Sequence, residues 1–493
     1  MTATRVQLLT YAERLAGSIA GVGELLRGPL DAFGGVHLLP FFVPFDGADA
    51  GFDPVDHAAV DPRLGTWDDV RRIGEDREVT ADLIVNHVSA DSAEFVDWLE
   101  KQELSEYDGM FLTFDAVFPD RASEAMITAF YRPRQGLPFT AYRTADGRRR
   151  LVWTTFMPSQ VDIDVRHPAG VRYLEKLLGT LAGGGVTTIR LDAVGYAIKT
   201  PGSDSFMTDE TLVFVRDITR MAHDRGLRVL VEVHAHYTQQ LAIAPLVDLV
   251  YDFALSPLLL HSLGTGTVDR LERWLEIRPE NAIVVLDTHD GIGVIDAGPS
   301  GDREGLLSFE DMRDIFDRAA VATNGHSAVA SVLPAWTALP HQINATFFNV
   351  LGADPTAYLL CRAVQLFLPG IPQIYYVGLL GGLDDTALFA RSGQGRDVNR
   401  HTYSADEFRD ALAGIVPQAI LTLVRLRSEH PAFGGAFSWQ SIGPDSLRLE
   451  WTAEAANATL EIRTTAGAPA FVLECTESGT VRRFASAAEL AAG

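Results

Sequence analysis

Short apolar runs recur along this chain, and each is followed by a longer amphipathic stretch. Apolar strands that alternate with helices are typical of a parallel sheet covered on both faces. Eight such strands favour a closed (β/α)8 barrel over the alternative, a doubly wound open sheet. The predicted strands are Gln7–Tyr11, Gly35–Phe42, Ala81–Asn86, Thr187–Asp192, Arg228–Val233, Val247–Tyr251, Asn281–Asp287 and Pro372–Val377.

The spacing of these strands predicts an α/β fold, a TIM barrel with two inserted subdomains. Long segments separate the third strand from the fourth and the seventh from the eighth. Inserts at the carboxyl ends of barrel strands build the walls of an active site. Beyond residue 431 the apolar residues alternate, as in Ser446–Thr452, Ala458–Arg463 and Pro469–Glu474, which predicts a small antiparallel β domain. We therefore predict a barrel from residues 1–85, 165–290 and 352–431, subdomain B at 86–164, subdomain B' at 291–351 and a C-terminal β domain at 432–493.

Charge and cysteine usage narrow the function classes. The 41 Lys and Arg residues against 65 Asp and Glu residues give a net charge of −24, which repels nucleic acid and anionic membranes. Cys361 and Cys475 lack the spacing of a disulfide framework or thiolate metal site and fit a reducing, cytoplasmic setting. The N-terminal residues lack a signal-peptide pattern, and no run of about eighteen apolar residues occurs, so we expect neither secretion nor membrane spanning.

Four of the predicted strands end in polar residues, where a purely structural role needs few of them. The carboxyl ends of barrel strands converge on one pocket, so these side chains are expected to lie together. The bland alternative is that they merely cap the strands. The four runs are Asp82 to His87, Thr188 to Asp192, Val229 to His234 and Val285 to Asp290.

Three carboxylates in one pocket favour cleavage of a glycosidic bond through an oxocarbenium-like transition state. One carboxylate attacks the anomeric carbon, and another protonates the leaving oxygen and later deprotonates the acceptor. Arg190 lies two residues before Asp192, so both side chains point to the same face of their strand. The arginine can therefore hold that carboxylate in its ionised form.

These four segments resemble the four signature regions of the α-amylase family, glycoside hydrolase family 13. The resemblance implies a (β/α)8 barrel and a retaining mechanism. By position it makes Asp192 the nucleophile, Glu232 the acid/base and Asp290 the supporting carboxylate, with Arg190, His87 and His289 around the bound glucosyl ring.

A narrower resemblance runs from Pro44 to Trp67, which is similar to subfamily 18, the sucrose phosphorylases and their relatives. Further similar runs are Tyr131–Phe139, Phe156 with Gln160–Asp164, Tyr251–Leu255 and Gly395–Arg400. The resemblance implies that the glucosyl subsite is completed by Asp49, Phe52, Phe156, Gln160 and Arg396. The alternatives are that Phe52 and Phe156 are core aromatics and that Asp49 is a turn residue.

The resemblance implies that inorganic phosphate replaces water in the second half-reaction and that α-glucose 1-phosphate is released. Phosphate must then be bound within a negatively charged protein. Arg132 and Arg134 form the best local anion site in the sequence. We interpret the run from Arg148 to Arg150 as a solvated loop.

The sugar acceptor is expected to depend on residues Leu339 to Gln342. Sucrose-specific members carry Asp-Leu-Tyr-Gln there, whereas relatives that act on sucrose 6F-phosphate resemble this chain in having His at the position of His341. Loss of the carboxylate and a histidine that can become cationic both favour a phosphorylated sugar. Alternatively, Pro340 gives the loop another shape and His341 faces solvent. Sucrose, glucosylglycerol and glucosylglycerate remain alternative substrates.

Cofactors, oligomeric state and rival functions can also be predicted from the sequence. We expect no cofactor and no metal, since the sequence shows no cluster of oxygen ligands beyond the catalytic ones, and the resemblance implies a homodimer. A phosphate-independent hydrolase or transglucosidase is the rival enzyme, while a non-catalytic binding module is disfavoured by the retained carboxylates. Tyr131, Tyr196, His234 and Gln342 are also predicted to bind substrate.

Overall fold

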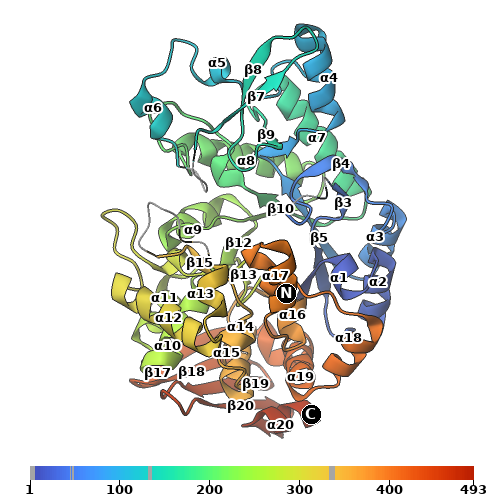
Figure 1. Ribbon diagram of the computed structural model, residues 1–493. Coiled ribbons are helices and arrows are strands. Elements are labelled where there is room, and N and C mark those ends of the chain that lie inside the picture. Colours follow the sequence, from blue (N-terminus) through green and yellow to red (C-terminus); the bar gives the residue numbers. More distant parts are fainter. Residues whose placement is uncertain (1–5, 45, 47–48, 132–135, 332, 334–338) are drawn as a thin grey trace.

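The computed structural model describes residues 6–44, 46, 49–131, 136–331, 333 and 339–493. Its centre is a closed barrel of parallel strands in the order β1-β16-β13-β12-β11-β10-β5-β2 (Figure 1). The barrel confirms the (β/α)8 prediction and rules out the open sheet. Its strands are β1 (Gln7–Thr10), β2 (Gly35–Leu38), β5 (Glu78–Ile84), β10 (Thr188–Asp192), β11 (Arg228–Val231), β12 (Leu249–Asp252), β13 (Ala282–Val284) and β16 (Ile371–Tyr375).

All eight predicted strands are present, but several end earlier than predicted. β11 ends at Val231, and Glu232 follows it directly. β13 ends at Val284, so the residues from Val285 to Asp290 leave the hydrogen-bonded ladder. Polar residues at these strand ends bond to other side chains rather than continuing the sheet. The departures therefore place the polar residues where the strands open into a pocket.

Helices surround the barrel and begin where the sequence supplies caps. Helix α7 starts with Pro168 after the N-cap His167, and α15 starts with Pro355 after the N-cap Asp354. Proline suits the first helical turn because it has no N–H to leave unbonded. The helices of this layer are α1 (Ala12–Leu15), α2 (Ile19–Arg27), α3 (Trp67–Gly74), α7 (Pro168–Gly183), α8 (Asp209–His223), α9 (Tyr237–Ile243), α10 (Leu255–Thr265), α11 (Asp269–Ile277), α15 (Pro355–Phe367), α16 (Tyr376–Leu379), α17 (Thr386–Ser392), α18 (Ala405–Leu412) and α19 (Ile415–Glu429).

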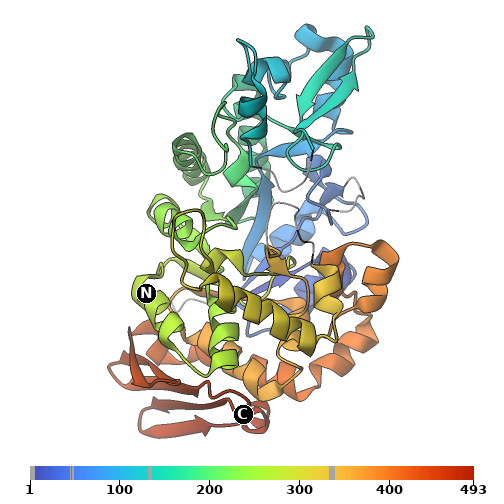
Figure 2. The ribbon, with the colours of Figure 1, turned by 60° about the vertical axis from the view of Figure 1, so that its left-hand side comes forward.

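The segment between β5 and β10 projects from one end of the barrel in both views (Figures 1 and 2). It has an apolar core of its own around Phe118, Phe130 and Trp153. Such a separate core lets the segment fold as a wall beside the barrel mouth. Its elements are the paired strands β6 (His87–Ser89) and β9 (Gln160–Asp162), the hairpin β7 (Phe139–Arg143) and β8 (Arg149–Trp153), and helices α4 (Ala93–Lys101), α5 (Phe114–Val117) and α6 (Glu124–Thr128).

A buried lysine ties this segment to the barrel. The Nζ of Lys199 donates to the Oδ1 of Asn86 at 2.9 Å and lies 2.7 Å from the Oδ2 of Asp162. It also donates to the backbone carbonyl of Tyr196. Because all three side chains are buried, the ammonium group holds strand ends and inserted segment in one arrangement.

The segment after Asp290 forms the opposite wall. Strand β14 (Ile292–Gly293) pairs antiparallel with β15 (Gln342–Ile343), which fixes the backbone beside His341. Helix α12 (Phe309–Ala322) begins at a capping box, in which Ser308 and Asp311 satisfy each other's backbone N–H. α13 (His326–Ala330) and α14 (Phe347–Val350) complete this wall.

The C-terminal residues form an antiparallel sheet of five strands, as the fold-class prediction requires. The sequence pattern indicated the three inner strands but not the first and last. Those outer strands are largely exposed, so they lack clear apolar alternation. The residue boundaries predicted for the domains stay a prediction. The strands are β17 (Ala436–Gly443), β18 (Ser446–Ala453), β19 (Ala456–Arg463), β20 (Ala470–Glu477) and β21 (Thr480–Phe484), followed by α20 (Ala487–Ala492).

No single helix among the described residues is both long and apolar enough to cross a membrane. One bent pair, α18 with α19, reaches that length and composition together, with a bend of 74° between its helices.

A buried ion pair joins α15 to the barrel, and we expect the stability of the fold to depend on it. The Nη2 of Arg362 lies 2.6 Å from the Oδ2 of Asp287, and neither side chain is more than 2 % exposed. Asp287→Ala leaves Arg362 buried without its counter-charge, so we expect the free energy of unfolding to fall by about 3–5 kcal/mol in urea denaturation. Asp406→Ala, which removes an exposed pair with Arg409, is the control and should cost about 1 kcal/mol or less. Equal effects of the two substitutions would contradict the prediction.

Candidate active site

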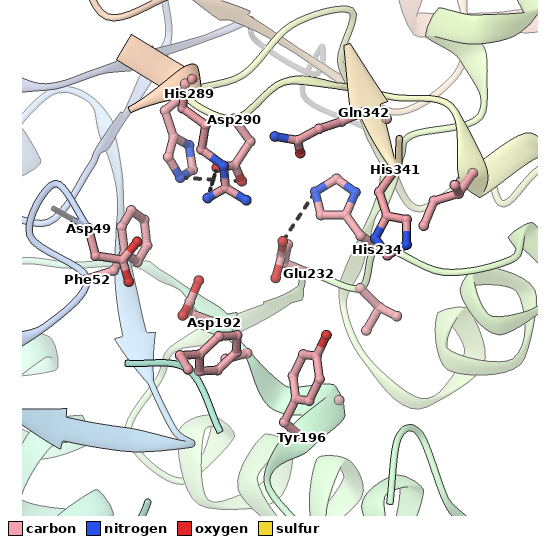
Figure 3. Close-up of a pocket in the computed structure, with 18 of the residues that line it drawn as sticks. Asp49, Phe52, Asp192, Tyr196, Glu232, His234, His289, Asp290, His341 and Gln342 are labelled. Atoms are coloured by element: carbon pink, nitrogen blue, oxygen red, sulfur yellow. Dashed lines mark ion pairs between the residues drawn. The ribbon is translucent and has the colours of Figure 1, made fainter. Parts of the chain in front are cut away.

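A cavity of about 470 Å³ opens at the carboxyl ends of the barrel strands, between the two inserted segments (Figure 3). Among the predicted site residues that the structure describes, all but Arg190 line this cavity, and Arg190 lies beneath it. Arg132 and Arg134 lie outside the described residues, so their predicted role stays a prediction. The cavity is lined by Asp49, Phe52, His87, Tyr131, Phe156, Gln160, Asp192, Tyr196, Glu232, His234, His289, Asp290, His341, Gln342 and Arg396.

Asp192 ends β10, and its carboxylate is held from below by Arg190. The Nη1 of Arg190 lies 2.8 Å from the Oδ1 of Asp192 and 2.5 Å from the Oδ1 of Asp82. Burial raises the pKa of Asp192 well above its ordinary value, while Arg190 acts in the opposite direction. The side chain is 15 % exposed toward the cavity. Arg190 is therefore the group that favours the charged form of Asp192.

A second layer fixes Arg190 itself. Asp82 on β5 contacts both Arg190 and, at 3.0 Å, the Nε2 of His37 on β2. Burial alone would raise the pKa of Asp82, but Arg190, followed by His37, lowers it to about 2. Asp82 therefore stays ionised and keeps the guanidinium aligned beneath Asp192. The Nη2 of Arg190 also lies 3.5 Å from the Oε1 of Glu232, so one guanidinium spans both carboxylates.

Asp290 is held by two arginines. The Nη1 of Arg396 lies 2.6 Å and the Nη2 of Arg400 3.8 Å from its Oδ1. Burial would raise the pKa of Asp290, but Arg396 and then His289 lower it well below its ordinary value. Asp290 therefore contributes a fixed negative charge to the cavity.

Glu232 faces the cavity directly after β11 and pairs with His234. The Nε2 of His234 lies 3.3 Å from the Oε1 of Glu232, as the dashed line in Figure 3 shows. Burial alone would lower the pKa of His234, but Asp296, followed by Glu232, raises it to about 9. His234 is therefore cationic at neutral pH.

Two neutral histidines and an aromatic ring form one end of the cavity. Burial lowers the pKa of His87, and it lowers that of His289 to about 3. The ring of His289 stacks on Phe52 with centroids 4.9 Å apart and planes at 10°. The Nε2 of His87 bonds the backbone oxygen of Phe52 at 3.0 Å. A flat apolar face with neutral donors beside it suits a sugar ring and its hydroxyl groups.

Asp49 belongs to this end of the cavity as well. Its Oδ2 accepts from the Nε2 of Gln160 at 2.7 Å, and the Oε1 of Gln160 accepts from the Met157 amide. Gln160 is buried on β9 of the inserted segment. In Figure 3, Asp49 and Phe52 lie on the opposite side of Asp192 and Glu232 from His341. Asp49 therefore faces the site rather than only forming a turn.

Aromatic side chains form a side wall of the cavity, and His341 and Gln342 form its other end. The ring of Tyr196 stacks against Tyr131 at 6.1 Å and contacts Phe156 edge-on at 5.1 Å. His341 and Gln342 project from the wall formed by β15 (Figure 3). Burial lowers the pKa of His341; Asp296 opposes this effect and His234 adds to it. Burial therefore favours the neutral form of His341.

Several lining residues were not predicted from the sequence. They include Asp296, Asn344, Phe206 and Arg400. Asn344 donates through its Nδ2 to the oxygen of Ala330 and supports Gln342. No strand-end pattern marks these positions, because they lie in connecting segments that reach the cavity only through the tertiary fold. Arg400 had the clearest signal, since it closes the run from Gly395 that resembled the family.

One group among the described residues has metal-ligand spacing. Ligand atoms of Glu232, His234 and Asp290 lie within 4.8 Å of one another. Asp290 is paired with Arg396, and His234 is flanked by Asp296. The guanidinium of Arg396 and the protons on the ring of His234 therefore compete with a metal ion for the ligand atoms of Asp290 and His234.

The barrel and its three clustered carboxylates define the chain as a carbohydrate-active enzyme. The family model "Alpha amylase, catalytic domain" matches residues 29–242. A sucrose phosphorylase of Agrobacterium vitis is 50 % identical over 90 % of this chain and 92 % of its own length. A sucrose 6(F)-phosphate phosphorylase of Thermoanaerobacterium thermosaccharolyticum is 36 % identical over 91 % of this chain and 92 % of its own length. The crystal structure of sucrose 6F-phosphate phosphorylase from Thermoanaerobacter thermosaccharolyticum has a TM-score of 0.91 at 33 % identity and covers 99 % of this chain and 98 % of that one.

The chain therefore belongs to the α-amylase family, glycoside hydrolase family 13, and within it to the sugar phosphorylases. The resemblance drawn from the strand-end motifs is confirmed at this level.

Proposed function

We propose that this enzyme cleaves a sucrose-type α-glucoside with inorganic phosphate through a glucosyl-enzyme on Asp192. The observation that carries this proposal is the placement of Asp192 and Glu232 at the two ends of the Arg190 guanidinium, at 2.8 and 3.5 Å. In a retaining double displacement one carboxylate attacks the anomeric carbon and a second carboxyl group beside it acts as acid and then as base. The phosphorylase relatives supply the reaction class.

The first step transfers the glucosyl group to the protein. The carboxylate of Asp192 forms a bond to the anomeric carbon while the bond from that carbon to the leaving oxygen breaks. Glu232 gives its proton to that oxygen. Asp290, held ionised by Arg396, stabilises the positive charge that develops on the sugar.

The second step releases the product. A phosphate oxygen forms a bond to the anomeric carbon, the bond to Asp192 breaks, and Asp192 leaves as a carboxylate. The phosphate proton goes to Glu232, which is then ready to act as an acid again. The products are α-glucose 1-phosphate and the sugar that left in the first step.

For the leaving sugar we propose fructose 6-phosphate, so that the substrate is sucrose 6F-phosphate. The support is His341, which lines the end of the cavity away from Asp49 and Phe52. Although burial disfavours the cationic form of His341, a phosphate ester beside it would favour that form. Sucrose is the second candidate, because the sucrose phosphorylase relative is the more similar at 50 % against 36 % identity.

Reverse synthesis discriminates these substrates. Phosphate release from glucose 1-phosphate is measured with fructose, fructose 6-phosphate, glycerol and glycerate as acceptors. We expect fructose 6-phosphate to give the highest kcat/KM. A higher value with fructose would assign sucrose as the substrate. Glucose release that does not depend on phosphate in the forward direction would overturn the phosphorylase proposal as a whole.

Substitution of His341 tests the role of this wall. In His341→Tyr we expect kcat/KM for fructose 6-phosphate to fall about 10- to 100-fold relative to fructose, because a charge-assisted hydrogen bond is lost. His223→Gln removes a histidine that is half exposed and paired with Asp248 on the outside of the barrel, so it should leave the ratio unchanged. An unchanged ratio in His341→Tyr would remove this residue from phosphate recognition.

A further inference from the structure

Asp296 is a buried carboxylate whose place in the site no strand-end motif marks. It lies on the short helix η4 (Ile295–Ala297), and its side chain is 0 % exposed although it borders the cavity. Its Oδ1 accepts from the Ala235 amide at 3.2 Å, and its Oδ2 lies 3.4 Å from the Nδ1 of His234. A Cβ at Gly293 would sit 2.3 Å from the same Oδ2. The glycine therefore leaves the room in which the carboxylate reaches His234.

Both ring nitrogens of His234 face a carboxylate. Nδ1 faces Asp296 at 3.4 Å, and Nε2 faces Glu232 at 3.3 Å. The ring is held in this orientation by stacking on Phe253, with centroids 4.0 Å apart. An imidazole between two carboxylates satisfies both only if each nitrogen carries a proton. The geometry therefore favours the doubly protonated, cationic ring.

The charged groups around His234 come from three parts of the fold. Glu232 follows β11, Asp290 follows β13, and Asp296 lies on η4, and all three favour the cation. The charge on His234 in turn lowers the pKa of His341, which lies in the segment before β15. Asp296 has the largest favourable effect on the pKa of His234 after the opposing effect of burial. Without Asp296, burial would thus be offset only by the more weakly acting Glu232 and Asp290.

We propose that Asp296 is a positioning residue which keeps His234 cationic at the acceptor end of the cavity, so that phosphate rather than water attacks the glucosyl-enzyme. The inference rests on the proposed function. Asp192 is bound to the sugar at this step, so phosphate enters beside the carboxylates of Glu232 and Asp290, and a fixed cation offsets their repulsion for an anionic acceptor. Water gains nothing from the same charge.

The attack keeps the balance of bonds and protons given above. The phosphate oxygen binds the anomeric carbon as Asp192 leaves, and the proton goes to Glu232. His234 remains protonated throughout, with its Nε2 3.3 Å from the Oε1 of Glu232, and the Oε2 of Glu232 takes the transferred proton. Asp296 acts only through His234.

The test is the partition of one intermediate between two acceptors. α-Glucosyl fluoride is supplied with a fixed concentration of inorganic phosphate, and initial rates of glucose 1-phosphate and glucose formation are measured across the pH range. Asp296→Asn keeps an oxygen for the Ala235 amide but removes the charge. We expect the ratio of phosphorolysis to hydrolysis in Asp296→Asn to match the wild type near about pH 6 and to fall about tenfold or more below it near about pH 8, as His234 loses its proton. The ionisation of phosphate affects both proteins alike.

Two further variants separate charge from structure. His234→Gln should have the low ratio at every pH, and adding Asp296→Asn to it should change the ratio no further. A loss in Asp296→Asn that is the same at all pH values, or additive effects in the double variant, would overturn the role of Asp296. If the wild type forms no glucose 1-phosphate, the proposed function itself fails, whatever the variants do.

Discussion

Asp192→Asn is expected to abolish glucosyl transfer while the barrel remains folded. The amide has nearly the shape of the carboxylate but lacks the charge and lone-pair strength that attack the anomeric carbon. Loss of a nucleophile in a coupled catalytic set lowers kcat by about 10⁴- to 10⁶-fold. Initial rates of glucose 1-phosphate formation measure the loss.

The fold should survive because the surrounding contacts do not depend on Asp192 alone. Arg190 keeps its pair with Asp82 at 2.5 Å, and the asparagine oxygen can still accept from its Nη1. Circular dichroism and thermal unfolding of the variant therefore provide the structural check. Asp314→Asn is a matched control, because this aspartate pairs with Arg318 on the outer face of α12, and full activity is expected.

A covalent label locates the nucleophile directly. A glucosyl fluoride with a second fluorine on its ring, which loads the enzyme faster than the intermediate breaks down, should add one fluoroglucosyl mass to the peptide with Asp192. The same treatment should leave Asp192→Asn unlabelled. Retained turnover in the variant, or a label on another residue, would displace Asp192 from this role.

The barrel was predictable because its signal is regular. Each strand is a short apolar run followed by an amphipathic helix, and parallel strands covered on both faces need little polar sequence. The runs at Gln7 and Ile371, far apart in the chain, pair in the closed sheet as the eight-strand count requires. The edges of the C-terminal sheet were missed, since β21 is exposed along almost its whole length.

The same contrast holds in the site. Asp192, Glu232 and Asp290 were found because they end or follow barrel strands, where the sequence pattern points to one pocket. Asp296 and Asn344 were not found, because each lies in a connecting segment whose position depends on contacts far along the chain. Asp296 reaches His234 across 62 positions. Local periodicity carries no information about such a contact.

The charge states of the histidines could not be predicted from the sequence either. A histidine that can become cationic was expected at position 341, yet burial lowers the pKa of His341 and Asp296 raises that of His234 to about 9. The sign of each shift depends on which carboxylates face the ring after folding. A fixed positive charge beside His341 thus lies on His234.

Glu232→Gln is expected to lose activity to a degree that depends on the leaving group. Glutamine keeps an oxygen near His234 but can neither donate the proton to a sugar oxygen nor accept one from phosphate. With a sucrose-type donor, whose alkoxide is a poor leaving group, we expect kcat/KM to fall about 10²- to 10⁴-fold. Release of the sugar product measures this loss.

Two donors separate acid catalysis from a general disturbance of the site. Fluoride leaves without a proton, so formation of the glucosyl-enzyme from α-glucosyl fluoride should be within about tenfold of the wild type in Glu232→Gln. Single-turnover release of fluoride isolates this first step. The Asp192→Asn variant, by contrast, should fail with both donors, because the nucleophile is needed whatever the leaving group. The two variants therefore have different expected patterns on the same pair of substrates.

The second half-reaction adds an independent measurement on the same variant. Once α-glucosyl fluoride has loaded Asp192, turnover requires a base to take the proton from the acceptor, so the glucosyl-enzyme should accumulate in Glu232→Gln and show a burst of fluoride. Azide, an anion that attacks without losing a proton, should shorten the life of this intermediate and form glucosyl azide. Equal losses with both donors and no burst would mean that Glu232 shapes the pocket instead of transferring protons, and the assignment of the acid/base would move to another side chain of the cavity.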